Sequence, residues 1–272
     1  MPVQQYFGRA VSVRIGLPGL FGKAYTDLRT TFSVERNTKR DPNKAKISIY
    51  NMDSVSRGLA QQTGSVILLS AGYGLFPGLL FAGDISKRGL KIEKEGPDII
   101  TTIEAGDGEI AHKDVRFIQS FGPGTPNSTI LPLLLGVMVL GLAPAEPLIP
   151  LIYQNGVTFM GTAADALDRL VKDVGQGWSI QDGLVQILSP GGVRADGAVL
   201  LTSETGMIGS PVRTKDGMNF KTLLNGTIKP GSFLQVVAQD VSGFYKAHKV
   251  KHDGDTHGGS WYTEIEAKEI KP

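Results

Sequence analysis

The residues best suited to chemistry gather near the end of the chain, where the three histidines His248, His252 and His257 have Asp253 and Asp255 among them. Imidazole and carboxylate groups are common metal ligands. The flanking residues alternate as in a strand, so four residues would separate His248 from His252 by about 13 Å. That distance is too long for one shared ion, and the glycine-rich segment holding the two aspartates is typical of a turn. We expect no metal site and no cofactor.

Catalytic patterns are equally weak. The pairs Glu104 with Asp107 and Asp253 with Asp255 could serve a glycosidase, but acids at strand ends and in turns are far more often surface residues. The chain has no G-x-S-x-G motif, and Gly19-Leu20-Phe21-Gly22-Lys23 lacks the spacing of a phosphate-binding loop. It has no cysteine, which excludes thiol catalysis and disulfides. The sequence predicts a protein that is not an enzyme and has no catalytic residues.

The composition favours many short strands joined by tight turns. The 272 residues include 35 glycines and 15 prolines, and 41% are hydrophobic, which is enough for a sizeable core. The formal net charge is only +2, with no basic stripe that would indicate nucleic-acid binding.

Alternating apolar and polar residues predict strands in the first part of the chain, as in Val11 to Ile15, Phe32 to Glu35 and Ile47 to Tyr50. Further strands are expected over 79–85 and 99–105, with a short helix over 54–62. The run from Val66 to Tyr73 is apolar on both faces. It therefore needs cover from a second domain or a neighbouring subunit.

The sequence in the middle of the chain predicts a small helix-plus-hairpin domain. Thr162 begins an amphipathic helix that reaches Val174, with Asp165 placed as in a capping box. Two short strands then flank Asp182-Gly183, a strong hairpin signal. The apolar segment 130–142 is too short to span a membrane, and it favours a buried or interface helix.

After Thr205 the alternation typical of strands returns, for example from Leu234 to Ala238 and from Trp261 to Ala267. We therefore expect a mainly β (α+β) fold with three parts. These are an N-terminal β-barrel over 1–118, the helix-plus-hairpin domain over 119–204, and a C-terminal β module over 205–272 that completes a second barrel.

A succession of motifs, none specific alone, resembles the hub proteins of phage tail baseplates in the order of that family. The motifs are Asn43-Lys44-Ala45-Lys46-Ile47-Ser48-Ile49-Tyr50-Asn51-Met52, Ala71-Gly72-Tyr73, Leu80-Phe81-Ala82-Gly83-Asp84-Ile85, Ile103-Glu104-Ala105-Gly106-Asp107-Gly108, the stretch 162–187, Leu223-Leu224-Asn225 with Pro230-Gly231, and His252-Asp253-Gly254-Asp255 with Trp261. The resemblance covers nearly the whole chain.

The resemblance implies two tube-like barrels per chain and a homotrimeric ring of six barrels. Such a ring joins the six-fold tail tube protein to the three-fold spike protein, beside other baseplate proteins, in the tail of the virion. DNA would pass through its bore without specific binding. Closed rings also pair strand edges that would otherwise be free.

The strand 66–73 supplies the interface candidates, Val66, Leu68, Ala71 and Tyr73. Three other functions stay open: a cell-wall-degrading enzyme of the tail tip, a membrane-perturbing tip protein acting through 130–142, and the hub of a phage-like contractile injection system.

Overall fold

The computed structural model describes residues 8–17, 19–74, 77–239 and 241–270. The chain forms two compact units. Unit 1 combines residues up to Asn37 with Asn43–Asp107 and the C-terminal part from Gly197. Unit 2 consists of Gly108–Asp196 together with the loop Thr38–Pro42. The protein is mainly β, as the sequence predicts.

Unit 1 contains one continuous sheet with two β modules. In the first module the strands are β1 (Arg9–Leu17), β2 (Leu20–Tyr25), β3 (Thr30–Asn37), β4 (Lys44–Tyr50), β5 (Val66–Tyr73), β6 (Leu79–Glu95) and β7 (Asp98–Gly106), with helix α1 (Ser54–Ala60). In the second module they are β15 (Ala198–Leu201), β16 (Val212–Thr214), β17 (Gly217–Leu223), β18 (Phe233–Val237), β19 (Ser242–Asp255) and β20 (Trp261–Glu269). The main path runs β16-β17-β20-β19-β3-β4-β7-β6-β5-β1-β2, and β18 pairs with both β15 and β19.

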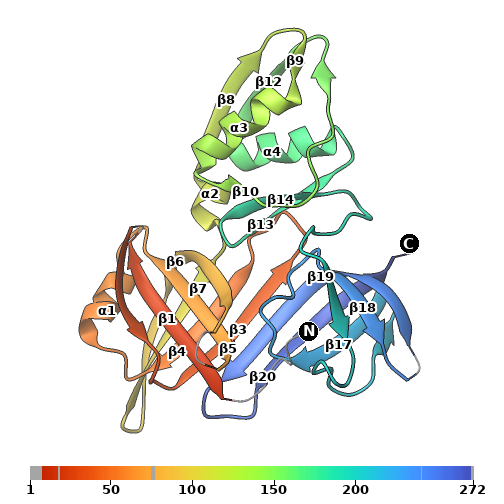
Figure 1. Ribbon diagram of the computed structural model, residues 1–272. Coiled ribbons are helices and arrows are strands. Elements are labelled where there is room, and N and C mark those ends of the chain that lie inside the picture. The colour runs from red at the N-terminus through yellow and green to blue at the C-terminus, as the bar shows by residue number, and fades with distance from the viewer. Residues whose placement is uncertain (1–7, 18, 75–76, 240, 271–272) are drawn as a thin grey trace. The chain divides into compact units, whose positions relative to one another are not determined.

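Two long strands give this sheet its shape by changing partners along their length. The first part of β19 pairs with β18, and its second part, Lys249 to Asp255, pairs with β3. Figure 1 shows β3 and β19 side by side where the two modules join. The pairing of β3 with β19 therefore makes one sheet of the two modules.

Strand β6 pairs first with β5 and then with β7, with a register shift between Ile85 and Leu90. Glycine is required at this corner because the backbones approach closely. A Cβ atom at Gly89 would lie 2.4 Å from the carbonyl oxygen of Glu104.

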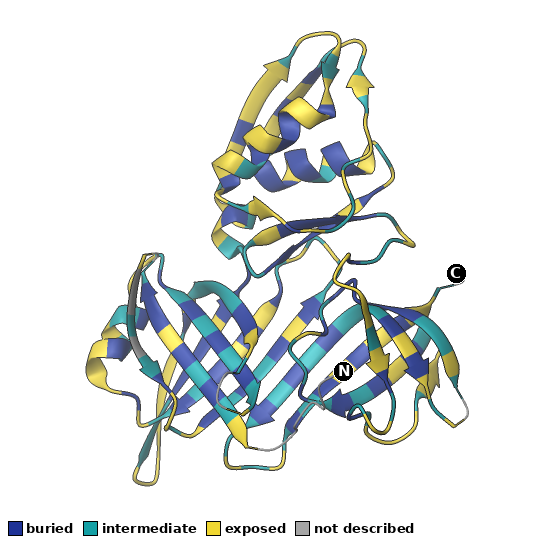
Figure 2. Cartoon of the chain, viewed as in Figure 1, coloured by how far each residue is buried: buried dark blue, intermediate teal, exposed yellow. Residues whose placement is uncertain are grey.

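The period of two found in the sequence places one face of each strand in a core. In β4 the residues Ala45, Ile47 and Ile49 are buried, whereas Lys44 and Lys46 are exposed. The first module encloses a cluster that includes Phe32, Phe81 and Trp261. The second encloses another around Phe220, Leu234 and Tyr245. Figure 2 shows the alternation of buried and exposed positions along these strands.

Unit 2 combines helices with short strand pairs. Its helices are α2 (Glu109–Lys113), α3 (Asn127–Met138) and α4 (Ala163–Lys172), and its strands are β8 (Arg116–Phe121), β9 (Thr125–Pro126), β10 (Gly141–Leu142), β11 (Ile152–Tyr153), β12 (Val157–Thr162), β13 (Gly177–Gln181) and β14 (Leu184–Leu188). Strand β8 pairs with β12, and β13 forms a hairpin with β14.

Local signals in the sequence account for these elements of unit 2. The hydroxyl of Thr162 accepts a hydrogen bond from the amide of Asp165 at 3.1 Å, the N-cap expected for α4. Asp182 and Gly183 both have positive φ, as a two-residue hairpin turn of type I′ requires. Leu167 and Leu170 of α4 are fully buried in the core.

The contacts divide the chain differently from the boundaries expected at 118/119 and 204/205. Residues 108–118, with α2 and the start of β8, lie in unit 2, and β15 pairs with β18 inside unit 1. The two β modules share one unit because β3 is hydrogen-bonded to the second part of β19, Lys249 to Asp255. A long-range pairing of this kind is not visible in local patterns.

Candidate functional site: the polar face of the shared sheet

The most extensive organised set of polar side chains in unit 1 lies on the face of the shared sheet that points away from the two cores. We call this surface, formed by the outward residues of β17, β20, β19, β3, β4 and β7, the polar face. One row of directly paired residues alternates in charge across five strands: Lys221, Glu264, Lys251, Glu35 and Lys44. The next row places Asp253, Ser33, Lys46 and Glu104 opposite one another.

The distances show that these groups interact. The amino group of Lys221 lies 3.2 Å from the carboxylate of Glu264, and that of Lys249 lies 3.5 Å from Glu266. Lys251 lies 3.1 Å from Asp253. The hydrogen bond to Asp253 raises the pKa of Lys251, and the charges of Asp253, Glu264 and Glu35 add to that effect. Lys251 therefore lies in the field of acids on its own strand and on both neighbouring strands.

The polar face is also free of large exposed apolar side chains. The hydrophobic residues of β3, β4, β17, β19 and β20 that are buried point into the cores, and the described residues of these strands and of β7 include no large hydrophobic side chain in the exposed class. Neighbouring opposite charges stabilise a sheet modestly, by roughly 0.2–1 kcal/mol for each pair. The polar face is therefore suited to contact with water and unsuited to a dry protein interface.

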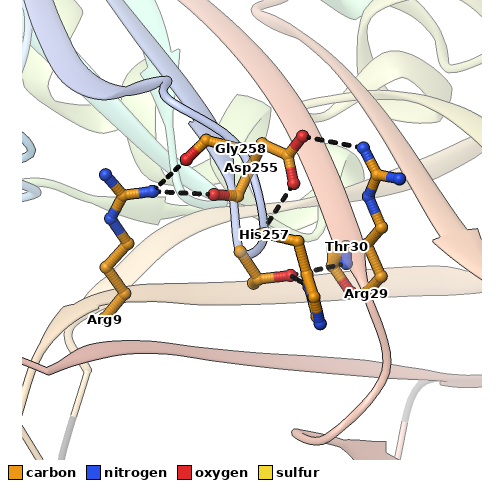
Figure 3. A network of polar contacts seen from close by, with 7 residues as sticks. Arg9, Arg29, Thr30, Asp255, His257 and Gly258 are labelled. Atoms are coloured by element: carbon orange, nitrogen blue, oxygen red, sulfur yellow. Dashed lines mark hydrogen bonds and ion pairs between the residues drawn. The ribbon is translucent and has the colours of Figure 1, made fainter.

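A network at the turn after β19 ties the second module to the first (Figure 3). The guanidinium of Arg9 donates to the carbonyl oxygens of Asp255, at 3.1 Å, and Gly258, while Arg29 forms an ion pair with the Asp255 carboxylate at 3.1 Å. Burial alone would raise the pKa of Asp255, but hydrogen bonds from Arg29 and the His257 amide outweigh it and lower that pKa. The charged side chain of Asp255 thus holds the turn to Arg29 in the segment before β3, and backbone carbonyls of the turn hold it to Arg9 of β1.

The histidines considered as metal ligands are separated by the fold. The ring of His252 is buried and its Nδ1 lies 2.9 Å from the Thr263 hydroxyl, while His257 lies in the exposed turn. A register shift in β19 falls at His248. Within the described parts of the chain, no three histidine or acidic side chains are grouped to hold a metal ion. The two acids considered as a glycosidase pair differ in exposure: Glu104 is exposed, whereas Asp107 is fully buried.

The interface candidates on β5 do not share one face. Val66, Leu68 and Tyr73 are half-buried, with Val66 and Leu68 on the outward face. Ala71 is 2% exposed and belongs to the core of the first module, so its side chain is not available to a neighbour. The strand has β1 on one side and β6 on the other, so both of its edges are paired. An interface role for its outward residues stays a prediction.

Sequence reasoning missed the polar face as a whole. Charges at every second position, such as Glu264 with Glu266 and Lys44 with Lys46, indicated that these strands have a polar side. The matching of opposite charges depends on the register between strands that are more than 200 residues apart, as Lys251 and Glu35 are.

A second surface, in unit 2, has the opposite character. The segment 117–145 contains no charged residue. Ile118 of β8 lies directly opposite Met160 of β12, and their side chains are 73% and 79% exposed. Val139, just after α3, is 88% exposed. No helix among the described residues is both long and apolar enough to cross a membrane.

Comparisons with known proteins identify the fold. No family model matches the chain, and none of the curated proteins matches its sequence. Among solved structures, a tail protein from Neisseria meningitidis matches with a TM-score of 0.67 and 12% identity, over 97% of both chains. The 43 kDa tail protein of prophage MuSo2 from Shewanella oneidensis matches with a TM-score of 0.67 and 9% identity, over 96% of this chain and 97% of that one.

A component of the type VI secretion system of E. coli, described as similar to the phage T4 tail proteins gp27 and gp5, also matches. Its TM-score is 0.60 at 11% identity, over 94% of this chain and 77% of that chain. The expectation of a tail-hub type of fold is thus confirmed, and this chain has, over nearly its full length, the fold of these phage tail and type VI secretion proteins.

Proposed function

We propose that the chain is a structural subunit of a tail baseplate hub, and that it works by assembling with copies of itself and not by catalysis. The observation that carries this proposal is the shared sheet, in which β3 and β19 join two β modules within a fold that matches tail proteins from end to end. In the proposed assembly, three copies form a ring of six modules between a six-fold tube and a three-fold spike, with DNA passing through the bore.

A general rule about identical subunits and one feature of the chain support an assembling protein. Heterologous contacts between identical subunits close into rings when the rotation between them permits it. The chain also carries exposed apolar side chains that lie opposite one another outside the polar face, namely Ile118 and Met160 of unit 2. Exposed apolar groups that lie together on a surface commonly mark sites of protein contact.

The test is the mass of the purified protein by light scattering, with negative-stain images of the same fraction. A mass of three chains and ring-shaped particles with an open centre are expected. If the protein is a monomer alone and also when mixed with tail tube and spike proteins, the hub assignment is wrong. Clearing of peptidoglycan in a zymogram would instead favour the enzyme of the tail tip.

The interface prediction on β5 has its own variant. Leu68→Asp places a charge on the half-buried outward face of β5, and we expect it to abolish the ring while the thermal unfolding of the monomer stays cooperative. Val55→Asp, on α1 at a residue that is 73% exposed, is the matched control. Rings formed equally well by both variants would remove β5 from the interface.

A second candidate is a hub of a contractile injection machine, which the match to the E. coli type VI component favours. The particle that contains the protein distinguishes a phage baseplate hub from the hub of an injection machine. Mass spectrometry of virions purified after induction of the host would detect it in a phage tail, whereas an injection machine would retain it in particles that contain no DNA.

A further inference from the structure

The small sheet of unit 2 that consists of β8 and β12 has an open strand edge. These two strands pair only with each other (Figure 1), so β8 has β12 on one side and, within the described residues, no strand on the other. The side chains agree with this, because most of the strand is exposed, namely Arg116, Ile118, Gln119 and Ser120. We call this side of β8 the open edge.

The register shows which backbone groups point to the open edge. The amide of Ala163 donates to the carbonyl oxygen of Val115 at 2.9 Å, in line with the β8–β12 register. In an antiparallel pair, alternate residues direct both backbone groups to the partner strand, and the residues between them direct both groups the other way. Gln119 therefore bonds to β12 as Val115 does, whereas the N–H and C=O groups of Ile118 and Ser120 point to the open edge.

The corresponding edge of β12 is covered, and that of β8 is not. Arg169 of α4 donates to the carbonyl oxygen of Thr158 at 3.0 Å and lies over the ring of Phe159. Exposed edge strands usually carry a lysine, a proline or a bulge that prevents pairing with another chain. The segment 116–121 has neither lysine nor proline, and its pairing with β12 shows no shift in register. The edge of β8 is thus suited to pairing.

The side chains beside the open edge indicate what would pair there. Ile118 and its partner Met160 form an apolar stripe that an added strand would continue. Arg116, at the start of β8, is exposed and has no hydrogen bond or ion pair with any residue that the structure describes. The edge therefore complements a segment that has an apolar residue and an acid two positions apart on one face.

We propose that the open edge of β8 binds an extended segment of a different protein as an added antiparallel strand. An apolar β-branched residue of that segment lies opposite Ile118, and an acid two residues later in the segment lies opposite Arg116. A second copy of this chain fits less well, because its own β8 carries the same arginine and no acid. The inference goes beyond the proposed hub function, since it concerns unit 2 and does not require a ring.

The first test is a selection from random short peptides displayed on yeast, with the purified full chain as bait. Peptides that bind Ile118→Pro are removed beforehand. That variant loses an N–H directed to the open edge and no bond to β12, which is where an edge strand accepts proline. The enriched peptides should share a β-branched residue followed two positions later by an acid. Failure to enrich any peptide on the natural chain over Ile118→Pro would overturn the proposal.

A second variant keeps the test decisive if Ile118→Pro unfolds unit 2, which thermal unfolding would reveal. Ile118→Lys retains the N–H group and adds the kind of charge that blocks natural edge strands, so it should lose the selected peptide. Val139→Lys is the matched control, because Val139 is also a highly exposed apolar residue but lies outside the sheet. Equal loss of binding in both lysine variants would show that the open edge is not the site.

The pairing with Arg116 is tested by exchanging charges. Arg116→Glu should weaken binding of a selected acidic peptide by about threefold, the size expected for one cross-strand pair. The same peptide with lysine in place of its acid should bind Arg116→Glu better than it binds the natural chain. If both peptides keep their order of affinity in Arg116→Glu, the acid does not lie opposite Arg116 and the proposed recognition is wrong.

Strand addition has a signature that docking of an apolar side chain lacks. In water–amide exchange measured by NMR, the amides of Ile118 and Ser120 should exchange rapidly in the free chain. Their exchange should slow by about tenfold when the selected peptide is present at about ten times its Kd. The amides of Phe117 and Gln119, already bonded to β12, should be absent from this rapid class throughout. Binding without slowed exchange at Ile118 and Ser120 would exclude an added strand.

The same measurement without peptide tests the other occupant. If exchange at Ile118 and Ser120 slows as the concentration of the chain rises, a second copy occupies the edge, and the proposal of a different protein is wrong. The hub function is tested separately by the mass of the particle. A chain that binds the selected peptide but forms no ring would contradict the hub proposal and support this one.

Discussion

The polar face of unit 1 and the outward side of the β8–β12 pair in unit 2 are both made of antiparallel strands with a core behind them, yet they expose opposite chemistry. On the polar face Glu35 lies opposite Lys251. On the β8–β12 pair Ile118 lies opposite Met160. Strand geometry alone therefore does not decide what a sheet presents. The first surface is stable in water, and the second is suited to burial against another protein.

The same contrast extends to the helices of unit 2. The exposed side of α3 includes Leu133 and Val137, each 44% exposed, and the helix contains no charged residue. In α4 the exposed side is charged, with Asp168 in ion pairs to Arg40 and Lys172. Much of the exposed apolar surface of unit 2 thus comes from the uncharged segment 117–145, and Met160 of β12 adds to it opposite Ile118.

The largest effect is expected from the core of unit 2, because it tests whether the two units are stabilised separately. Leu167→Ala removes a fully buried side chain of α4 and should lower the free energy of unfolding of unit 2 by about 3 kcal/mol. Hydrogen exchange, read amide by amide, should show the loss in unit 2 and little change in β3 or β4. Leu133→Ala on exposed α3 is the control, and loss of protection throughout unit 1 would show that the units unfold together.

The next effect concerns the start of α4. Thr162→Ala removes the side-chain cap on the Asp165 amide and should cost about 1 kcal/mol in the stability of unit 2. Thr162→Ser keeps the hydroxyl and should recover most of that loss in a denaturant titration. If the serine variant is as unstable as the alanine variant, the hydroxyl does not provide the cap.

A smaller effect is expected from pH, and it should also be specific to unit 2. Burial lowers the pKa of His112 below its ordinary value of 6.5, and the charge of Arg40 lowers it further. The neutral ring accepts a hydrogen bond from Nε of Arg40 at 3.3 Å and stacks on Trp178.

Because the folded state disfavours protonation, His112 contributes stability above pH 6.5 that is lost as the pH falls through its lowered pKa. His112→Gln should therefore make the stability of unit 2 less dependent on pH between 7 and 5. His257→Gln, in the exposed turn after β19, is the control. An unchanged pH dependence in His112→Gln would exclude this imidazole as the source.

The smallest effect is expected on the outward side of the β8–β12 pair. Ile118→Thr combined with Met160→Thr changes two highly exposed side chains and should alter the stability of the isolated chain by no more than about 0.5 kcal/mol. Thermal unfolding of the double variant measures this directly. A loss well above that amount would mean that this pair is buried by the chain itself.

Local patterns in the sequence determined much of this protein by themselves. Alternation in Ile47 and Ile49, the cap at Thr162 and the turn at Asp182-Gly183 each depend on neighbours in the chain, and each predicted its element. The succession of motifs also pointed to the tail-hub fold, which the structural comparisons confirm.

The tertiary structure decided what no local pattern contains. The pairing of β3 with β19 merges two predicted domains into one unit, and it brings Glu35 to Lys251 from positions 216 residues apart. The register between the strands decides which charges meet, because a shift of one residue would turn every such side chain to the opposite face of the sheet. The sequence alone determined that these strands have a polar side, and only long-range pairing made of those sides one continuous surface of matched charges.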